Sequence, residues 1–206
     1  MSEDPRARAA ASLRRLGHAL MAHDAGRSLL ERVADAADRV AGELEDAPER
    51  TRDLLDLKRR MCDVEVPDGA RVVHFDECFV SGPYNPLGIA IEVRRDGDEA
   101  VAHVEIGPAF EGAPGRSHGG VVAAVFDDVL GYLLTLEHAP GFTGELSVRY
   151  LAPTPILVPL EFRARVVGRE ERKLHTEAEA RAGDDVVATA TATCMLIDPA
   201  RMRGGS

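Results

Sequence analysis

The sequence predicts an α+β fold in which a mostly antiparallel sheet wraps around one central helix, preceded by an N-terminal helical extension. From residue 71 onward, hydrophobic residues recur mainly at every second position, which is typical of strands with one buried face. The nearly continuous apolar stretch at residues 121–136 interrupts this pattern. Because it is longer than an ordinary strand and follows two glycines, it predicts a buried helix.

The predicted strands fall on both sides of this helix. The period of two places strands at residues 71–80, 87–95 and 99–107 before the helix, and at residues 144–151, 158–168, 173–182 and 185–197 after it. Asp96-Gly97 and Gly183-Asp184 are typical of tight hairpin turns. Since hairpins join antiparallel strands, most of the sheet is expected to be antiparallel.

The N-terminal residues predict a separate helical extension. Between residues 7 and 61, hydrophobic residues recur at three- and four-residue spacing, and Gly26 interrupts the pattern just before Ser28, a candidate N-cap. A further short helix is expected around residues 50–60, and the turn-rich residues 64–69 mark a boundary. We therefore expect an extension at 1–65, one domain at 66–198 and a tail at 199–206. The extension offers no candidate catalytic group and is expected to support stability or assembly.

The composition narrows the partners of the chain. The formal net charge is −10, with no block of Lys or Arg, so neither nucleic acid nor an anionic membrane surface is an expected partner. Three cysteines far apart in the sequence argue against a disulfide framework or a zinc site and fit a reduced, cytoplasmic compartment. The N-terminus lacks the apolar core of a secretory signal, and no run of about 18 apolar residues predicts a membrane span.

The most informative segment reads SHGGVVAAVFDD at residues 117–128. The first turn of a helix leaves backbone N–H groups unpaired, and Gly119 and Gly120 would let a substrate carbonyl approach them closely. This turn is therefore a candidate oxyanion site. Asp127 lies two and a half turns further along the apolar helix. Burial there would raise the pKa of its carboxyl group and make it a stronger base.

The sequence His118-Gly119-Gly120, with an acid nine residues after the histidine, resembles the signature of PaaI-like hotdog acyl-CoA thioesterases. Residues 78–88 (CFVSGPYNPLG) resemble the segment that opens the domain in many relatives. Residues 147–155 (SVRYLAPTP) resemble the strand that follows their central helix. The resemblance covers residues 70–198 and implies a hotdog fold, in which an antiparallel sheet wraps around the central helix.

The resemblance also implies roles for individual residues. In this family the acid activates water or attacks the thioester carbonyl directly, and the residue after the histidine donates its backbone N–H to that carbonyl. These roles correspond to Asp127 and Gly119. Thr143 matches a position at which several relatives place a hydroxyl near the acid of the partner subunit. Some relatives carry an Asn or Gln in the loop before the histidine, whereas residues 111–116 (EGAPGR) contain neither.

Three alternatives bear on this site. Asp128 is the rival acid, but it lies about 100° around the helix from Asp127 and is expected to cap or pair locally. His118 could act as a general base, or its ring could hydrogen-bond the backbone and shape the loop. The family's use of an acid favours the second reading. Thr143 could simply end a loop.

The expected function is hydrolysis of an acyl-CoA thioester to free acid and CoA. The resemblance implies a homodimer or homotetramer with the site at the subunit interface. Gly120, Val122 and Phe126 are expected to bind substrate, and the chemistry requires no metal or bound cofactor. The alternative is a non-catalytic acyl-CoA-binding or regulatory hotdog protein. A hotdog hydratase would resemble a different motif, with an Asp and a His a few residues apart in one loop, which this sequence lacks.

Overall fold

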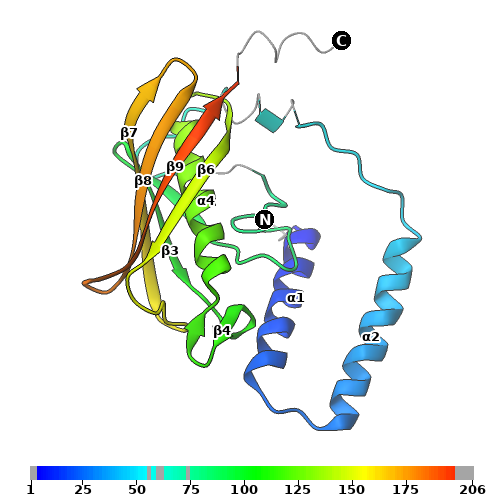
Figure 1. The fold of residues 1–206 in the computed structure, drawn as a ribbon. Coiled ribbons are helices and arrows are strands. Elements are labelled where there is room, and N and C mark those ends of the chain that lie inside the picture. Colours follow the sequence, from blue (N-terminus) through cyan, green and yellow to red (C-terminus); the bar gives the residue numbers. More distant parts are fainter. Residues whose placement is uncertain (1–3, 55–56, 59–62, 73–74, 198–206) are drawn as a thin grey trace.

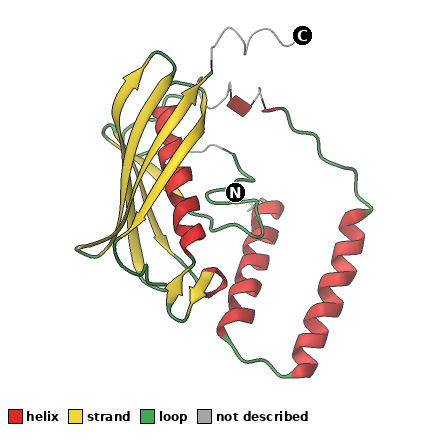
Figure 2. Ribbon diagram, in the orientation of Figure 1, coloured by secondary structure: helices red, strands yellow, loops and turns green. Residues whose placement is uncertain are grey.

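The computed structural model describes residues 4–54, 57–58, 63–72 and 75–197, and its main feature is a curved sheet that wraps one long helix (Figures 1 and 2). The sheet has seven strands in the order β1-β2-β3-β7-β8-β9-β6, with antiparallel neighbours throughout. The strands are β1 Arg71–Val72, β2 Glu92–Asp96, β3 Glu99–Glu105, β6 Gly141–Tyr150, β7 Pro159–Glu170, β8 Lys173–Ala182 and β9 Asp185–Leu196. The expected α+β hotdog architecture is confirmed.

The central helix α4 (Gly119–Leu136) forms the core with the inner face of the sheet. Its buried side chains include Val122, Phe126 and Leu130, and the Phe126 ring meets Phe162 of β7 edge to face, with ring centroids 5.0 Å apart. Its 18 residues have a mean hydropathy of 1.6, so by length and composition alone it could cross a membrane. Half of this helix is instead buried inside the fold, as its apolar sequence requires of a core helix.

The first part of the sheet is shorter than the sequence predicts. Of the strand expected at 71–80, only Arg71–Val72 pairs as a strand, residues 73–74 lie outside the described residues, and turns follow up to Gly88. The next strand begins at Glu92 rather than at residue 87. Turn-forming Gly and Pro residues explain the difference. At Gly82 the chain folds so tightly that an added Cβ would lie 2.3 Å from the backbone nitrogen of Cys78.

The loop before α4 also contains short elements that the sequence does not predict. These are a 3₁₀ turn η1 (Pro108–Phe110) and a small hairpin of β4 (Glu111–Ala113) and β5 (Arg116–Ser117). Gly115 turns this hairpin with a positive φ of 73°, a conformation that glycine adopts without strain. The hairpin leads directly into the first turn of α4.

Two helices form most of the N-terminal extension. Helix α1 (Pro5–Ala22) is capped by the Asp4 carboxylate, which accepts a hydrogen bond from Arg6 N–H at 2.8 Å, and it packs on η1. Helix α2 (Arg27–Glu45) stands apart from the sheet, and none of its side chains is buried (Figure 1). The predicted N-cap Ser28 is wrong, because the N-cap is Gly26, two residues earlier, and the helix begins at Arg27. In the short helix expected at 50–60, Leu54, Leu57 and Lys58 are helical, while 55–56 and 59–60 lie outside the described residues.

Candidate active site

The turn that begins α4 is held by hydrogen bonds on both sides. The His118 ring caps the helix, because its Nδ1 accepts the Gly120 N–H at 3.0 Å. The His118 N–H donates to Phe110 O at 2.9 Å, and the Ser117 N–H donates to Thr154 O at 2.9 Å. The imidazole of His118 thus makes a structural hydrogen bond to the backbone, which is the alternative to a role as general base.

Gly119 occupies the first position of the helix and lines an open hollow of about 570 Å³. Its N–H makes no hydrogen bond to any part of the chain that the structure describes, as expected for the first turn of a helix. Its carbonyl accepts a 2.6 Å hydrogen bond from the Tyr150 hydroxyl, which fixes the orientation of this peptide. Val122 and residues 150–154 line the same hollow, so its wall is mainly apolar.

The remaining residues expected to bind substrate take different positions. Gly120 is exposed beside the His118 ring, next to this first-turn hollow. Phe126 is completely buried and points into the core toward Phe162, so its ring does not line the hollow. Since α4 turns about 100° per residue, the faces bearing Val122 and Phe126 are separated by about 40°, enough to turn Phe126 under the sheet.

Asp127 lies further along α4, in a second hollow of about 350 Å³. The hollow also contains Thr143 and Phe142 of β6, so one chain places the carboxylate and the hydroxyl residue of the predicted site together. The resemblance implied instead that the hydroxyl lies near the partner's acid. The expectation that Asp127 is buried is wrong for this chain, because its side chain is exposed. Asp127 lies on the part of α4 beside the edge strand β6, and β6 leaves this face of the helix uncovered.

Asp128 is the half-buried acid of the pair. Its Oδ1 accepts a hydrogen bond from Cys78 Sγ at 3.1 Å, and the Ser81 hydroxyl also bonds to it. Burial raises the pKa of Asp128, and the negative charge of Asp127 adds to this effect, while the two hydrogen bonds oppose it. Its buried Oδ2 has no hydrogen-bond partner among the described residues. Asp128 therefore pairs locally, as expected, and is the poorer candidate for contact with substrate.

Gly119 and Asp127 are too far apart to act on one carbonyl within one chain. They are eight residues apart on a continuous helix, which separates them by about 12 Å along its axis. They line different hollows, one at the first turn and one at mid-helix. An oxyanion donor and an attacking group must both lie about 3 Å from the reacting carbonyl. Each chain therefore carries two half-sites of different chemistry.

The comparisons with known proteins fall on this same region. Residues 115–189, which contain Gly119, Asp127 and Thr143, match the family model of the thioesterase superfamily. A crystal structure of a thioesterase superfamily protein is 30% identical, covers 92% of this chain and 94% of its own, and superposes with a TM-score of 0.77. The chain belongs to the thioesterase superfamily. Because that structure matches over nearly its whole length, the similarity of this thioesterase superfamily member includes the extension as well as the hotdog domain.

Curated relatives carry a more specific name. The acyl-coenzyme A thioesterase THEM4 of Xenopus laevis is 32% identical over 91 residues, which are 44% of this chain and 41% of that protein. The protein of the same name from Bos taurus is 25% identical over 149 residues, which are 71% of this chain and 61% of that protein. This superfamily member therefore spans less than two thirds of the length of either curated relative.

Two residues of the half-sites could not be found from the sequence. Lys58 of the extension lines the Asp127 hollow, although the extension was expected to lack any group at the site. Tyr150 lines the Gly119 hollow and bonds to the Gly119 carbonyl. Neither residue belongs to a motif of fixed spacing, because each reaches its half-site through a contact between segments far apart in the sequence. For Tyr150 a signal exists in the segment at 147–155, but that segment does not indicate where the hydroxyl points.

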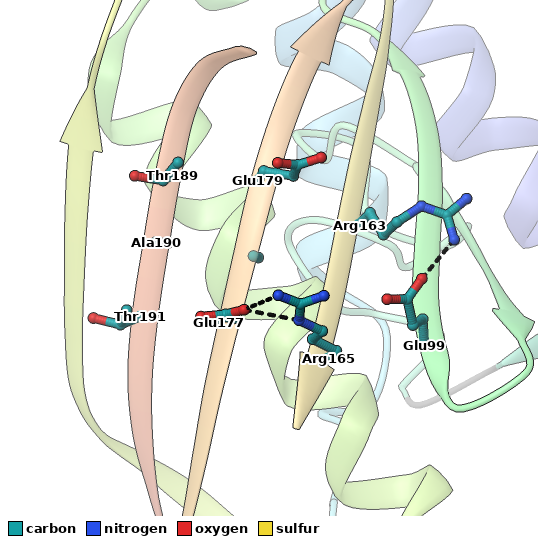
Figure 3. A pocket seen from close by; sticks show the side chains of 9 residues that line it. Glu99, Arg163, Arg165, Glu177, Glu179, Thr189, Ala190 and Thr191 are labelled. Atoms are coloured by element: carbon teal, nitrogen blue, oxygen red, sulfur yellow. Dashed lines mark hydrogen bonds and ion pairs between the residues drawn. The ribbon is translucent and has the colours of Figure 1, made fainter. Parts of the chain in front are cut away.

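A third hollow, of about 370 Å³, lies on the outer face of the sheet and has different properties (Figure 3). Its charged side chains pair across neighbouring strands. Arg165 donates to Glu177 at 2.7 Å, and Arg163 donates to Glu99 at 2.6 Å, which raises the pKa of Arg163. Because these charges satisfy one another, we interpret this surface as a solvated face of the sheet.

Proposed function

We propose that this protein hydrolyses acyl-CoA thioesters to a free acid and CoA. The observation that carries the proposal is the exposed Asp127 carboxylate on α4, which shares a hollow with Thr143 of β6. The first turn of the same helix presents the N–H of Gly119. The names of the curated relatives support an acyl-CoA substrate. The His118-Gly119-Gly120 turn, with the acid nine residues after the histidine, supports placement in the PaaI-like branch.

In the proposed reaction, the Asp127 carboxylate accepts a proton from a water molecule as that water attacks the thioester carbonyl carbon. The carbonyl oxygen becomes an oxyanion and accepts a hydrogen bond from Gly119 N–H. Collapse of the tetrahedral intermediate breaks the C–S bond, and the thiolate of CoA receives the proton. In the covalent route, an Asp127 oxygen attacks the carbonyl itself, the C–S bond breaks and CoA leaves as a thiolate. Water then hydrolyses the resulting anhydride to the free acid and the Asp127 carboxylate, and the proton released from that water goes to the thiolate.

The distance between the half-sites leads to a second part of the proposal, a site shared by two copies of the chain. Asp127 of one copy would face Gly119 of the other, which makes two equivalent sites in a two-fold dimer. The edge strand β6 supports this arrangement. It is ten residues long, most of its residues are exposed, and it borders the Asp127 hollow. An uncovered edge of this length is a ready surface for pairing with a second chain.

Thiol release from a panel of acyl-CoA esters tests the activity and the acyl preference together. Turnover that disappears in Asp127→Asn is the expected result. Binding of acyl-CoA esters without any thiol release would instead favour the non-catalytic alternative. Stereospecific hydration of an enoyl ester would place the protein in a different reaction class.

Mixing two inactive variants tests the shared site. An Asp127→Asn chain and a Gly119→Ala chain are each expected to be nearly inactive. In a mixed dimer, one site combines both substitutions and the other contains neither. Random mixing should therefore restore about a quarter of the parent activity, because half of the dimers are mixed and each has one intact site. If both groups acted within a single chain, mixing would restore nothing.

A further inference from the structure

Among the described residues of the N-terminal extension, Lys58 lines the Asp127 half-site. Its ammonium donates a hydrogen bond to the carbonyl oxygen of Gly141 at 2.8 Å, across 83 residues of sequence. The same nitrogen lies 4.3 Å from the centroid of the Phe142 ring, which is within the range of a cation–π contact. Gly141 and Phe142 are the first two residues of β6, and Thr143 is the third.

The start of β6 needs such a support for two reasons. It is an edge strand, so β9 is its only partner among the strands that the structure describes. Its pairing with β9 is also irregular at this point, because the register shifts between Thr143 and Glu145. A bulge weakens the ladder locally and redirects the neighbouring side chains. The direction in which Thr143 points is therefore set less firmly by strand pairing than it would be in the middle of the sheet.

We propose that Lys58 is a positioning residue that latches the start of β6 and so holds Thr143 in the Asp127 hollow. Lys58, Phe142, Thr143 and Asp127 all line this hollow, which places the latch beside the residues that it orients. The hydrogen bond fixes the backbone at Gly141, and the stacked ammonium fixes the ring of the residue that precedes Thr143. The extension is then part of the active site rather than only an element of assembly. The kinetic part of this inference rests on the proposed thioesterase function.

Lys58→Met in the full-length chain removes the charge and keeps the length of the side chain. We expect it to lower kcat by roughly tenfold with little change in KM, because misplacing a group beside the reacting atoms impairs the chemical step more than binding. Lys58→Arg should recover much of this loss, since guanidinium can also donate to a carbonyl and stack on an aromatic ring. Arg39→Met is the charge-matched control, because Arg39 lies on α2 and pairs only with Glu43 among the described contacts.

A double-mutant cycle separates positioning from a general loss of stability. If Lys58 acts through Thr143, then Lys58→Met should cost little more in a Thr143→Val background, because the hydroxyl that it positions is already absent. Multiplicative effects of the two substitutions on kcat would overturn the inference. So would an unchanged kcat in a folded Lys58→Met variant.

Amide hydrogen exchange tests the latch independently of turnover. In Lys58→Met, exchange at residues 141–144 should increase about tenfold or more, while exchange in β8 stays as in the parent. Unchanged exchange at residues 141–144 would overturn the latch, whether or not the protein is active. If the parent released no thiol from any ester but the exchange increased as expected, the proposed function would fail and the latch would stand.

Discussion

The two hollows along helix α4 differ in the chemistry they offer, although they belong to one continuous element. The first-turn hollow presents the N–H of Gly119 within a mainly apolar wall, and none of the described residues that line it carries a carboxylate. The Asp127 hollow, at mid-helix, contains two carboxylates, a hydroxyl and the Lys58 ammonium, but no first-turn N–H group. A helix separates its unpaired donors from its interior positions by construction. The proposed reaction needs both groups at one carbonyl, so it would require a second helix in another orientation, which a two-fold partner would supply.

A finer contrast lies within the mid-helix hollow, between two adjacent acids. Asp127 is exposed beside Thr143, whereas Asp128 is turned inward toward Cys78 and Ser81. Because successive helical residues point about 100° apart, neighbouring carboxylates experience different surroundings. One can contact water and substrate, while the other is held in the wall behind it.

The largest expected effect is that of Asp127→Asn. The amide is similar in shape but cannot accept a proton or attack a carbonyl, so thiol release should fall by about 10²–10⁴-fold. Steady-state hydrolysis of the best ester of the panel measures this loss, and Asp128→Asn is the matched control on the neighbouring residue. If Asp127→Asn stayed within a few-fold of the parent while Asp128→Asn lost its activity, the roles of the two acids would be reversed.

Gly119→Ala should break the first-turn hollow. An added Cβ would lie 3.3 Å from the Tyr150 hydroxyl and ring, so the tyrosine that bonds to the Gly119 carbonyl must shift by a few tenths of an ångström. Tilting or crowding the N–H donor should lower kcat by about 10²–10³-fold. Gly17→Ala on α1 is the control, because a Cβ there meets nothing within 4 Å. An unchanged rate in a folded Gly119→Ala variant would remove the oxyanion role from this turn.

Asp128→Asn should affect stability more than turnover. Burial raises the pKa of Asp128 in the folded state, so the folded protein retains a proton that the unfolded chain has lost. The contribution of Asp128 to the free energy of unfolding is therefore complete below its unfolded pKa of about 3.9. This contribution is lost as pH rises through the higher folded pKa. Asn imitates the neutral acid and should reduce this decrease. Thermal unfolding of both proteins from about pH 4 upward measures the difference. A parallel pH dependence in the two proteins would contradict it.

The smallest expected effect concerns the support of the first-turn hollow by α1. His18 Nδ1 accepts the Ala109 N–H at 3.1 Å, and the His18 ring meets Phe110 edge to face. Burial, and then the charge of Arg14, lower the pKa of His18. Its neutral form is the one that accepts this hydrogen bond. This contribution is therefore complete above the unfolded pKa of about 6.5 and is lost as pH falls from there toward the folded pKa.

His18→Phe keeps the contact with the Phe110 ring but removes the acceptor for Ala109 N–H. We expect it to lower the free energy of unfolding by about 1 kcal/mol at pH 8 and to remove the loss of stability on acidification near pH 6, values in the usual range for one hydrogen bond and for a histidine. Denaturant unfolding at the two pH values measures both effects. A variant with unchanged stability and unchanged pH dependence would show that this contact does not hold α1 in place.

The strand and helix assignments that succeeded rest on periodicity. The long apolar stretch gave α4, and the four segments after it correspond to β6 to β9 within a few residues. Residues 75–80 and 87–91 were wrongly predicted as strand, because turn residues outweigh alternation wherever the chain must fold back on itself. The amphipathic pattern predicted α1 and α2 equally well, yet it did not show that α1 docks through His18 while α2 has no buried side chain.

The sequence alone predicted the candidate residues of the proposed site. Its residues specify a glycine turn at the start of a buried helix and an acid nine positions after His118. These features are local, so spacing is sufficient to read them. Only the tertiary structure decided which acid is exposed, that Phe126 belongs to the core, and that Lys58 lies beside Asp127. Each of these depends on which surface another segment covers, and contacts across many residues of chain leave no periodic trace in the sequence.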